Sequence, residues 1–379
     1  MQSLEGNGIM PILIFGAGAI GSLLGYRLSS AGHDVMLIGR ERYVSAVQEH
    51  GLLLEERGSS GRDHRQGHVV ATSIGKDSVA LGNVVHPGAA ERIEDIPAHQ
   101  RSWNLVVLTV KAYDTTAAAH DLAPHLPADV PVLIVQNGVG GEELAREVLG
   151  QTEIISGVLT MSVSALSPGH FRLETSRGGL SLAPTRKGQE VQPWADLFAT
   201  TGMRMAIYDD YRALKWSKLL LNIQANAIPA ILDMSPGDVF AHADLFALER
   251  RAFLEAWEVM RGLHLRPIGF PGYPVPLLVW AMRALPALLL RAVLGRMVAS
   301  GRGDKLPSLQ MDLAKGLQRS EVLYLNGAVV THGERLGLNV PVNRVLLHTL
   351  MGMVNGTIPW DAFRGQPQRL LGAVESERG

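Results

Sequence analysis

The sequence predicts an α/β protein in which a Rossmann-like, doubly wound N-terminal domain is followed by an all-helical C-terminal domain. Strand and helix patterns alternate as far as about residue 150, as they do in doubly wound parallel sheets. From Tyr211 onward the apolar residues recur at helical spacing. A G-x-G-x-x-G fingerprint at the first strand–helix junction predicts in addition that the first domain binds a dinucleotide.

The glycine fingerprint follows a strand at residues 12–15 whose residues are all apolar, and a helical pattern follows it. In such a unit Gly16 permits the tight turn, Gly18 lets the backbone approach a pyrophosphate, and Gly21 lets helix and strand pack closely. The helix N-terminus supplies N–H groups and a positive dipole end for the phosphates. The alternative, a glycine-rich turn without a ligand, is less favoured because both flanks fit. The expected cofactor-binding residues here are Gly16, Gly18, Ala19, Ile20 and Gly21.

The second strand, at residues 35–38, indicates which dinucleotide is bound. In NAD-binding domains an acidic residue near the end of this strand binds the ribose 2′-hydroxyl, whereas this chain has Arg40, with Arg42 close behind. A guanidinium pairs well with a 2′-phosphate, so the sequence favours NADP. The alternative is an ordinary solvated arginine at the start of the next helix.

Composition excludes several classes of function. The chain has 379 residues, 46% of them hydrophobic, and a formal net charge of −1, so it can fill two or three cores and has no bulk attraction to nucleic acid. It has no cysteine, which excludes disulfides, thiol catalysis and cysteine-ligated metal sites. The 13 histidines show no metal-ligand spacing, and we expect no metal. The first residues lack a signal-peptide pattern, so we expect a cytoplasmic protein.

The organisation along the chain is expected to be simple. Segments 154–165 and 170–183 look like strands joined across Ser167-Pro168-Gly169 that extend the same sheet. Segment 52–72 carries several glycines and serines among charged residues and is expected to be an irregular hairpin or loop. The expected divisions are a disordered lead at 1–9, an NADP-binding domain at 10–208, a helical substrate domain at 209–373 and a tail at 374–379.

Polar residues follow two of the predicted sheet strands. Lys111 comes directly after the strand near residues 105–110, and Asn137, within Gln136-Asn137-Gly138, follows the strand at 132–135. Taken alone, these are typical of a solvated lysine and an N-G turn. Because ligands of open α/β sheets bind beyond the carboxyl ends of the strands, the position favours cofactor and substrate contacts.

A second group of polar residues lies on a predicted helix at residues 214–228. Lys218, Asn222 and Asn226 are spaced i, i+4 and i+8 among leucines and an isoleucine, so they form one polar stripe on an apolar helix. Buried amine and amide groups need polar partners. One interpretation is a catalytic ammonium beside amides that hold a polar substrate, and the other is a hydrated face from which Lys218 reaches solvent.

Together with three short C-terminal segments, these motifs make the chain resemble the ketopantoate reductase family of NADPH-dependent 2-ketoacid reductases. The resemblance covers nearly the whole chain, and its order and spacing are more specific than any single part. It implies a Rossmann-like domain, a helical domain and an active site in the cleft between them. The segments that carry it are residues 16–21, 110–112, 136–140, 215–222, 308–312, 321–327 and 337–343.

The resemblance also implies roles for individual residues. Lys218 would be the general acid, because hydride addition to a ketone leaves an alkoxide that a nearby ammonium stabilises and protonates. Glu321, the second catalytic residue, would bind the substrate's distal hydroxyl and the lysine. The implied reaction is ketopantoate to pantoate, a step of pantothenate biosynthesis. The other implied contacts are Asn137, Asn222, Asn226 and Ser308 to substrate, and Arg40, Lys111, Asn137 and Glu321 to NADP.

The chain departs from the family pattern in two places. Leu323 stands where the family commonly has an aspartate, and an extra residue before Glu321 would displace that side chain slightly. Residues 266–305 form a segment that is longer than in the family pattern and strongly apolar, and the arginines that interrupt it argue against a transmembrane helix. A cap over the cleft or a homodimer contact is favoured over a basic amphipathic helix on a membrane surface.

Three alternatives to ketopantoate reduction stay open. The first is reduction of a different, more apolar 2-ketoacid. The second is an opine-type or glycerol-phosphate-type dehydrogenase, which also joins a Rossmann domain to a helical one but does not predict Lys218 with Glu321. The third is a non-catalytic NADP-binding sensor, against which the intact lysine, amide and glutamate count.

Overall fold

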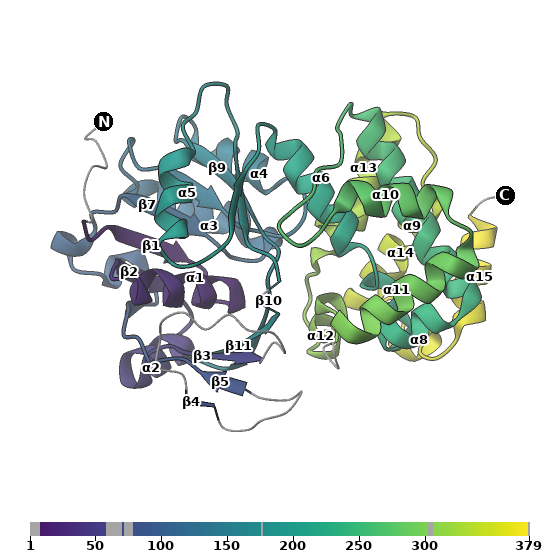
Figure 1. Cartoon of the computed structure of the whole chain (residues 1–379), viewed down its shortest axis with the longest axis horizontal. Helices are drawn as coiled ribbons and strands as arrows, with labels where there is room; N and C mark the ends of the chain where they lie inside the picture. Colours follow the sequence, from purple (N-terminus) through teal and green to yellow (C-terminus); the bar gives the residue numbers. More distant parts are fainter. Residues whose placement is uncertain (1–7, 58–69, 72–78, 176, 302–305, 378–379) are drawn as a thin grey trace. The chain divides into compact units, whose positions relative to one another are not determined.

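The computed structural model describes residues 8–57, 70–71, 79–175, 177–301 and 306–377, and the chain forms two compact units (Figure 1). The α/β unit contains the chain up to Gln136, residues 141–211 and the short segment Phe270–Tyr273. The helical unit contains Asn137–Gly140, Arg212–Gly269 and the chain from Pro274 on. The predicted fold class, a parallel-sheet α/β domain followed by a helical domain, is confirmed.

The α/β unit is built on an eight-stranded sheet with the order β13-β12-β9-β8-β7-β1-β2-β6. Neighbouring strands are parallel except for β12, which runs antiparallel to β9. The strands are β1 (Pro11–Phe15), β2 (Asp34–Ile38), β6 (Gly88–Ala90), β7 (Leu105–Leu108), β8 (Val132–Ile134), β9 (Ile154–Leu159), β12 (Leu180–Pro184) and β13 (Met205–Ile207).

Helices cover both faces of this sheet, which explains why its central strands are uninterrupted apolar runs. Ile12 and Ile14 of β1 belong to one apolar core with residues of α1 (Ala19–Ser30), α2 (Glu41–His50) and α5 (Gln192–Ala199). Leu13, between them, belongs to a second core with residues of α3 (Thr115–Leu122) and α4 (Gly141–Leu149). Successive side chains of a strand point to opposite faces, so both must be apolar when both faces are covered.

A second, five-stranded sheet in this unit corrects one prediction. Its order is β10-β11-β3-β5-β4. The expectation that 154–165 and 170–183 extend one sheet is wrong in part, because β9 and β12 join the large sheet whereas β10 and β11 form a hairpin in the small one. The irregular hairpin or loop expected at 52–72 begins with the strand β3 and ends with the short strand β4, which both pair with β5, and residues 58–69 lie outside the described chain. The strands are β3 (Leu53–Arg57), β4 (Val70–Ala71), β5 (Val79–Leu81), β10 (Ser162–Ser167) and β11 (His170–Thr175).

The small sheet differs from the large one because only one of its faces is apolar. On β11, Phe171 and Leu173 are buried, and Phe171 packs edge-on against Tyr26 of α1 at a centroid distance of 5.9 Å. The alternate residue Arg172 donates from Nε to Glu55 Oε2 on β3 at 2.7 Å. This alternation of apolar and charged residues is the pattern of a half-buried strand, and it distinguishes β11 from the doubly covered strands.

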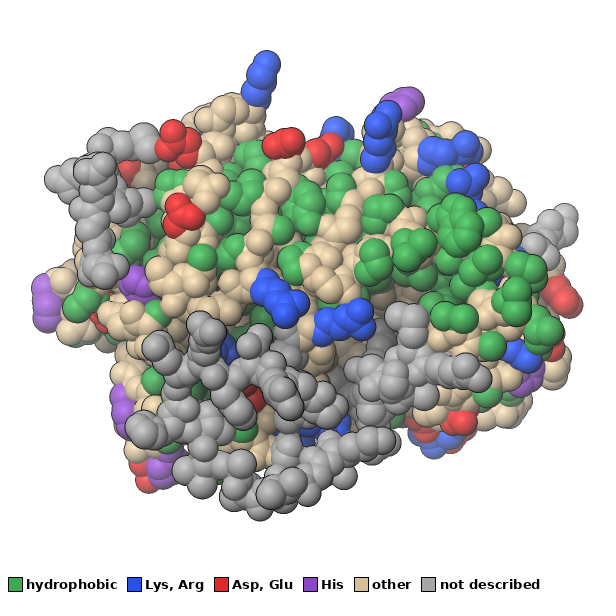
Figure 2. Space-filling model, in the orientation of Figure 1, with side chains coloured by type: hydrophobic (Ala, Val, Ile, Leu, Met, Phe, Trp, Pro, Cys, Tyr) green, Lys and Arg blue, Asp and Glu red, His purple; other side chains and the backbone are tan. Residues whose placement is uncertain are grey.

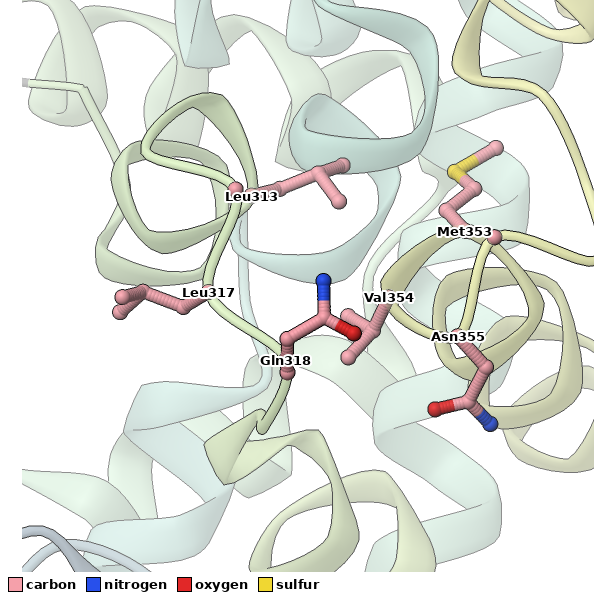
Figure 3. Close-up of a pocket in the computed structure, with 8 residues that line it drawn as sticks. Leu313, Leu317, Gln318, Met353, Val354 and Asn355 are labelled. Carbon is pink, nitrogen blue, oxygen red and sulfur yellow. The ribbon is translucent and has the colours of Figure 1, made fainter.

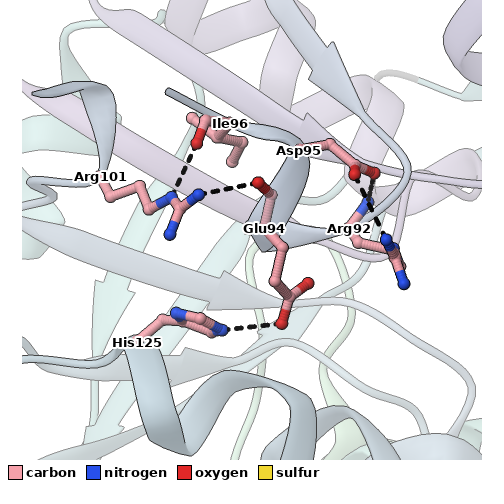
Figure 4. Close-up of polar contacts among 6 residues, drawn as sticks. All are labelled: Arg92, Glu94, Asp95, Ile96, Arg101 and His125. Carbon is pink, nitrogen blue, oxygen red and sulfur yellow. Dashed lines mark hydrogen bonds and ion pairs between the residues drawn. The ribbon is translucent and has the colours of Figure 1, made fainter. Parts of the chain in front are cut away.

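The connection between β6 and β7 is fixed by polar contacts around the short helix η1 (Ile93–Asp95) (Figure 4). Arg101 donates to the backbone oxygens of Ile96 and Glu94, both at 2.7 Å. His125 Nε2 lies 2.9 Å from Glu94 Oε1. The pKa of Glu94 is lowered, first by its own backbone N–H and then by His125. These contacts join chain segments to one another, so we assign the group a structural role.

The helical unit is organised around the 20-residue helix α9 (Ala243–Gly262), whose residues Phe246, Phe253 and Val259 are buried. Helices α8, α10, α11, α13, α14 and α15 all pack against it. No helix among the described residues is both long and apolar enough to cross a membrane. The helices besides α9 are α6 (Tyr211–Asn222), α7 (Ala227–Leu232), α8 (Pro236–Ala241), α10 (Val275–Ala284), α11 (Ala287–Gly301), α12 (Ser308–Ala314), α13 (Asn326–Arg335), α14 (Pro341–Val354) and α15 (Pro367–Ser376), with the short η5 (Glu321–Tyr324) and η6 (Trp360–Ala362).

The C-terminal end of the chain differs from the expected tail at 374–379. Helix α15 continues to Ser376, and Val374 is buried. Val374 lies one helical turn after the buried Leu370, so both face the same side of α15. The helical unit therefore extends at least to Ser376.

Candidate active site

Two glycines of the fingerprint are required by the protein's own packing. Gly16 has φ +114°, and a Cβ there would lie 2.5 Å from the backbone nitrogen of Val110. A Cβ on Gly21 would lie 2.2 Å from the carbonyl oxygen of Gly16. That same oxygen accepts a hydrogen bond from Thr109 Oγ1 at 2.6 Å. The turn after β1 is therefore held tightly against the end of β7.

Gly18 is different, because nothing in the protein lies within 4 Å of the position its Cβ would take. Its backbone is extended, with φ −83°, which any residue can adopt, and it is the N-cap of α1. Neither packing nor conformation requires glycine here. The first N–H groups of α1, including those of Ala19 and Ile20, have no partner within the helix. An open approach to these groups fits a pyrophosphate, so the residues present suit a bound dinucleotide.

The other predicted cofactor contacts of the α/β unit lie at strand ends. Arg40 is exposed and is the N-cap of α2, two residues after β2 ends. Lys111 is partly exposed and begins the turn that follows β7. Gln136 ties two strand ends together, since it accepts from Thr115 Oγ1 at 2.9 Å and donates to the Val110 carbonyl at 2.9 Å. Gln136 thus fixes the backbone from which Asn137 continues.

In the helical unit the structure brings Asn137 and Asn222 together. Asn222 Nδ2 donates to Asn137 Oδ1 at 3.1 Å. The loop after Asn137 is held on η5, because the Val139 N–H donates to the Tyr324 carbonyl at 3.0 Å. Gly138, at φ +89°, passes so close to Tyr324 that a Cβ would lie 2.6 Å from the Cβ of that tyrosine. Asn222 is thus the last residue of α6, and Asn137 lies in a loop that η5 holds in place.

The expected continuous helix at 214–228 is wrong, because α6 ends at Asn222 and α7 begins at Ala227. Between them Ala225 has φ +50°, and its N–H donates to Glu249 Oε2 at 3.0 Å. Lys218 and Asn222 share one face of α6 at i, i+4 spacing. The third member of the predicted stripe, Asn226, is instead the N-cap of α7.

Asn226 connects three segments of backbone. Its Nδ2 donates to the Asn222 carbonyl at 3.1 Å, and its Oδ1 accepts from the Leu309 N–H at 3.3 Å. Leu309 directly follows Ser308, the first residue of α12 and itself partly exposed. The side chain of Asn226 is buried. We therefore propose that Asn226 positions Asn222 and Ser308.

Replacing Asn226 with aspartate is expected to lower the free energy of unfolding by about 1–3 kcal/mol, because an oxygen would face the Asn222 carbonyl where an N–H now donates. Urea unfolding measures this difference. The matched control is Asn339→Asp, an exposed asparagine of the same unit, which should leave the free energy nearly unchanged. A variant of normal stability that lost only substrate affinity would instead assign Asn226 to substrate contact.

The two predicted catalytic residues differ in burial. Lys218 is partly exposed on α6, whereas Glu321, the first residue of η5, is buried. Ser320 precedes it and accepts the Val322 N–H, which starts the short helix. Lys215, one turn before Lys218, is buried as well and had no role in the sequence interpretation.

Several supporting residues could not be singled out from the sequence. Behind η5, Asn326 Nδ2 donates to Asn343 Oδ1 at 2.9 Å, and Asn343 Nδ2 donates to Glu255 Oε2 at 2.8 Å. Glu255 also accepts two backbone N–H groups at the start of α14, and burial raises its pKa. Glu249, on the same helix, supports the break after α6. The only signal in the sequence for Glu249 and Glu255 was that each is an acid on an otherwise apolar face of a long helix. That signal does not identify their partners.

One small pocket in the helical unit lies apart from these residues (Figure 3). It is formed by the end of α12, the loop after it and the end of α14, and the Gln318 amide lies between Leu313 and Val354. None of the predicted site residues lines it. Its volume of about 150 Å³ is below that of typical small-molecule sites. Among the described residues, no group of histidine and carboxylate side chains could hold a metal ion.

Comparisons with known proteins identify the family to which the chain belongs. Residues 12–187 match the family model "Ketopantoate reductase PanE/ApbA", and residues 210–354 match its C-terminal domain. A 2-dehydropantoate 2-reductase of Archaeoglobus fulgidus is 28% identical over 92% of this chain and 99% of its own, and one of Pyrococcus horikoshii is 26% identical over 89% and 95%.

Solved structures give the same result. A PanE/ApbA family ketopantoate reductase from Ralstonia eutropha JMP134 is 28% identical, with a TM-score of 0.71 over 92% of this chain and 99% of that one. Because the two family models together cover most of the sequence, the chain belongs to the ketopantoate reductase (PanE/ApbA) family of oxidoreductases, which act on a ketone or the corresponding alcohol.

Proposed function

We propose that the protein uses NADPH to reduce a small 2-ketoacid, with ketopantoate to pantoate as the leading reaction. The observation that carries the proposal is the grouping on α6 and η5: Asn222 bonded to Asn137, Lys218 one turn away on the same face, and Glu321 on the short helix that holds the loop after Asn137. An ammonium, two amides and a carboxylate suit a substrate that has a ketone, a carboxylate and a hydroxyl. The pantoate product would place the reaction in cytoplasmic pantothenate biosynthesis.

The cofactor is proposed to bind the α/β unit. The backbone of Gly16, Gly18, Ala19, Ile20 and Gly21 would hold the pyrophosphate, and Arg40 would pair with the 2′-phosphate. Lys111, at the end of β7, would contact the ribose or phosphates. When bound, the nicotinamide supplies the hydride.

Lys218 is proposed to be the residue that protonates the ketone oxygen during reduction. As the ketone oxygen gains negative charge, an ammonium beside it stabilises that charge and donates a proton to the oxygen, which gives the alcohol. Asn137 and Asn222 would orient the substrate through their amides, and Ser308 would donate to or accept from its polar groups. Glu321 would hold the distal hydroxyl and orient Lys218.

The fold alone does not decide the ketoacid or the cofactor. A D-mandelate dehydrogenase solved with NADH and anilino(oxo)acetate has a TM-score of 0.70 to this chain at 20% identity. A more apolar 2-ketoacid therefore stays the second candidate substrate, and the presence of a leucine at position 323 is the sequence feature that favours it. An opine-type reaction would require an amine as co-substrate.

The test is the decay of NADPH absorbance with ketopantoate and with a panel of branched and aromatic 2-ketoacids. The expected result is turnover with ketopantoate at the highest kcat/KM of the panel. A higher kcat/KM with an aromatic ketoacid would assign the second candidate. Decay only when an amine is added would indicate an opine-type enzyme, and NADPH binding without decay would indicate a sensor.

Cofactor choice depends on Arg40, and NADPH is expected to bind at least about tenfold more tightly than NADH, a difference of about 1.4 kcal/mol. Replacing Arg40 with aspartate should reduce or reverse that preference, because the carboxylate repels a 2′-phosphate and accepts from a 2′-hydroxyl. Fluorescence titration with both cofactors measures it. The neighbouring exposed Arg42 provides the control variant Arg42→Asp. Equal affinities in the unaltered protein would contradict the assignment.

A further inference from the structure

The apolar segment that distinguishes this chain from the family pattern forms two consecutive helices, α10 and α11, separated at Leu285 and Pro286. Helix α10 packs on α9, and α11 packs on α8 and α9. Their inward side chains include Val275, Met282 and Leu290, all buried. The segment is therefore attached to the helical unit along one face.

The outward face of the same helices is also apolar. Leu277 and Trp280 of α10 and Leu288, Leu289 and Val293 of α11 are each between 54% and 71% exposed. Leu277 and Trp280 are three residues apart on α10, and Leu289 and Val293 are four residues apart on α11, so each pair lies on one side of its helix. Figure 2 shows hydrophobic side chains gathered over these two helices. These five residues are called the apolar patch below, and contiguous exposed patches of this kind mark interaction sites.

The charge of this segment is of one sign. Helices α10 and α11 contain three arginines and no aspartate or glutamate, although the whole chain carries a net charge of −1. On α10, Arg283 is exposed three residues after Trp280 and is held over the Trp257 ring at 4.3 Å. On α11, Arg291 is partly exposed beside the patch. The patch thus combines leucines, a tryptophan and basic side chains.

This combination indicates what covers the patch. A second copy of the chain would bring arginine against arginine with no acid of the segment to pair with them, which costs binding energy. An anionic lipid surface offers acyl chains to the leucines, an interfacial layer to Trp280 and negative headgroups to the arginines. We propose that α10 and α11 bind this protein reversibly to the surface of an anionic membrane, in place of the cap or homodimer contact that the sequence favours.

The proposal is independent of the reaction and is tested without substrate. The full-length protein is sedimented with phosphatidylcholine vesicles made with and without phosphatidylglycerol. Binding to the anionic vesicles is expected to be about tenfold or more tighter than binding to the neutral ones, and to weaken as salt is added. Absence of binding to anionic vesicles would overturn the proposal.

The matched variants change exposed residues only. Trp280→Ser/Leu288→Ser should lower vesicle binding about tenfold or more, because it removes the largest and the most exposed side chain of the patch. Val84→Ser/Leu166→Ser, which removes two exposed apolar residues of the α/β unit, should not change it. Equal loss in both variants would overturn the assignment to the patch. A patch variant that halves in mass in solution while vesicle binding is unchanged would identify the patch as a contact between copies instead, and one that only reorders the preferred ketoacids would identify it as a cap.

Circular dichroism melting curves show whether the variants remain folded. The substituted side chains are exposed, so both double variants should unfold at nearly the temperature of the unaltered protein. Should the patch variant unfold early, Arg283→Ser provides a second route. This substitution leaves the Arg283 carbonyl, which accepts from Arg250, in place. The variant should have a smaller preference for anionic over neutral vesicles, and its binding to neutral vesicles should be unchanged. An unchanged preference would count against the proposal.

Discussion

Replacing Lys218 with alanine is expected to lower kcat about 100-fold or more, because it removes both the proton donor and the positive charge facing the developing alkoxide. NADPH affinity should be unchanged, since the proposed cofactor residues other than Asn137 and Glu321 lie in the α/β unit. Steady-state turnover with the best ketoacid and a separate NADPH titration measure the two effects. Loss of both together would indicate a folding defect rather than a catalytic one.

Two further variants separate the roles of Lys218. Lys218→Arg keeps the charge but replaces the ammonium with a guanidinium, which does not give up its proton in proteins, so it should restore substrate affinity and only part of kcat. Lys187→Ala removes an exposed lysine of the α/β unit and should leave all constants unchanged. Near-normal kcat in Lys218→Ala would show that another group protonates the alkoxide, and the buried Lys215 would then be the next to test.

The parts of the fold that the sequence predicted correctly are the strands whose central residues are all buried. Strands β1, β7 and β8 are covered on both faces, so each is an unbroken apolar run. Such a run would expose apolar side chains to water anywhere else in the fold. Strands β10 and β11 were assigned to the wrong sheet because pairing between distant segments, such as His170 with Leu53, leaves no local signal. Their apolar–polar alternation was present but did not identify a partner.

The break between α6 and α7 shows a second limit. The apolar spacing of the segment continues across the break, and the left-handed conformation at Ala225 is unusual for a residue that is not glycine. What supports it is a carboxylate, Glu249, that is 24 residues away and accepts the Ala225 N–H. A contact between distant residues therefore overrides the local helical pattern, and it moves Asn226 from a side-chain stripe to a helix cap.

For the site, sequence could place residues at strand ends but not specify their contacts. The position of Asn137 after β8 follows from strand topology, whereas its bond to Asn222 depends on the loop through Val139 being held by the Tyr324 carbonyl. Gly138 makes that approach possible because a side chain would meet Tyr324. In the sequence this glycine looked like an ordinary N-G turn.

Adding a methyl group to Gly18 is expected to weaken NADPH binding at least about tenfold while leaving stability unchanged. The Cβ of Gly18→Ala would meet no protein atom within 4 Å, and its backbone conformation is open to any residue. The methyl group would instead occupy the space through which a pyrophosphate approaches the N-terminus of α1. Cofactor titration and thermal unfolding measure the two quantities on the same sample.

Gly21→Ala is the matched variant, and it should show the opposite pattern. Its Cβ would lie 2.2 Å from the Gly16 carbonyl oxygen, so the helix must shift away from the strand, which is expected to cost about 1–3 kcal/mol of unfolding free energy. Its Tm should fall even without cofactor. A stable Gly21→Ala would contradict this division of roles, because Gly21 would then be dispensable for packing. A Gly18→Ala that binds NADPH normally would contradict it as well, because Gly18 would then be dispensable for cofactor binding.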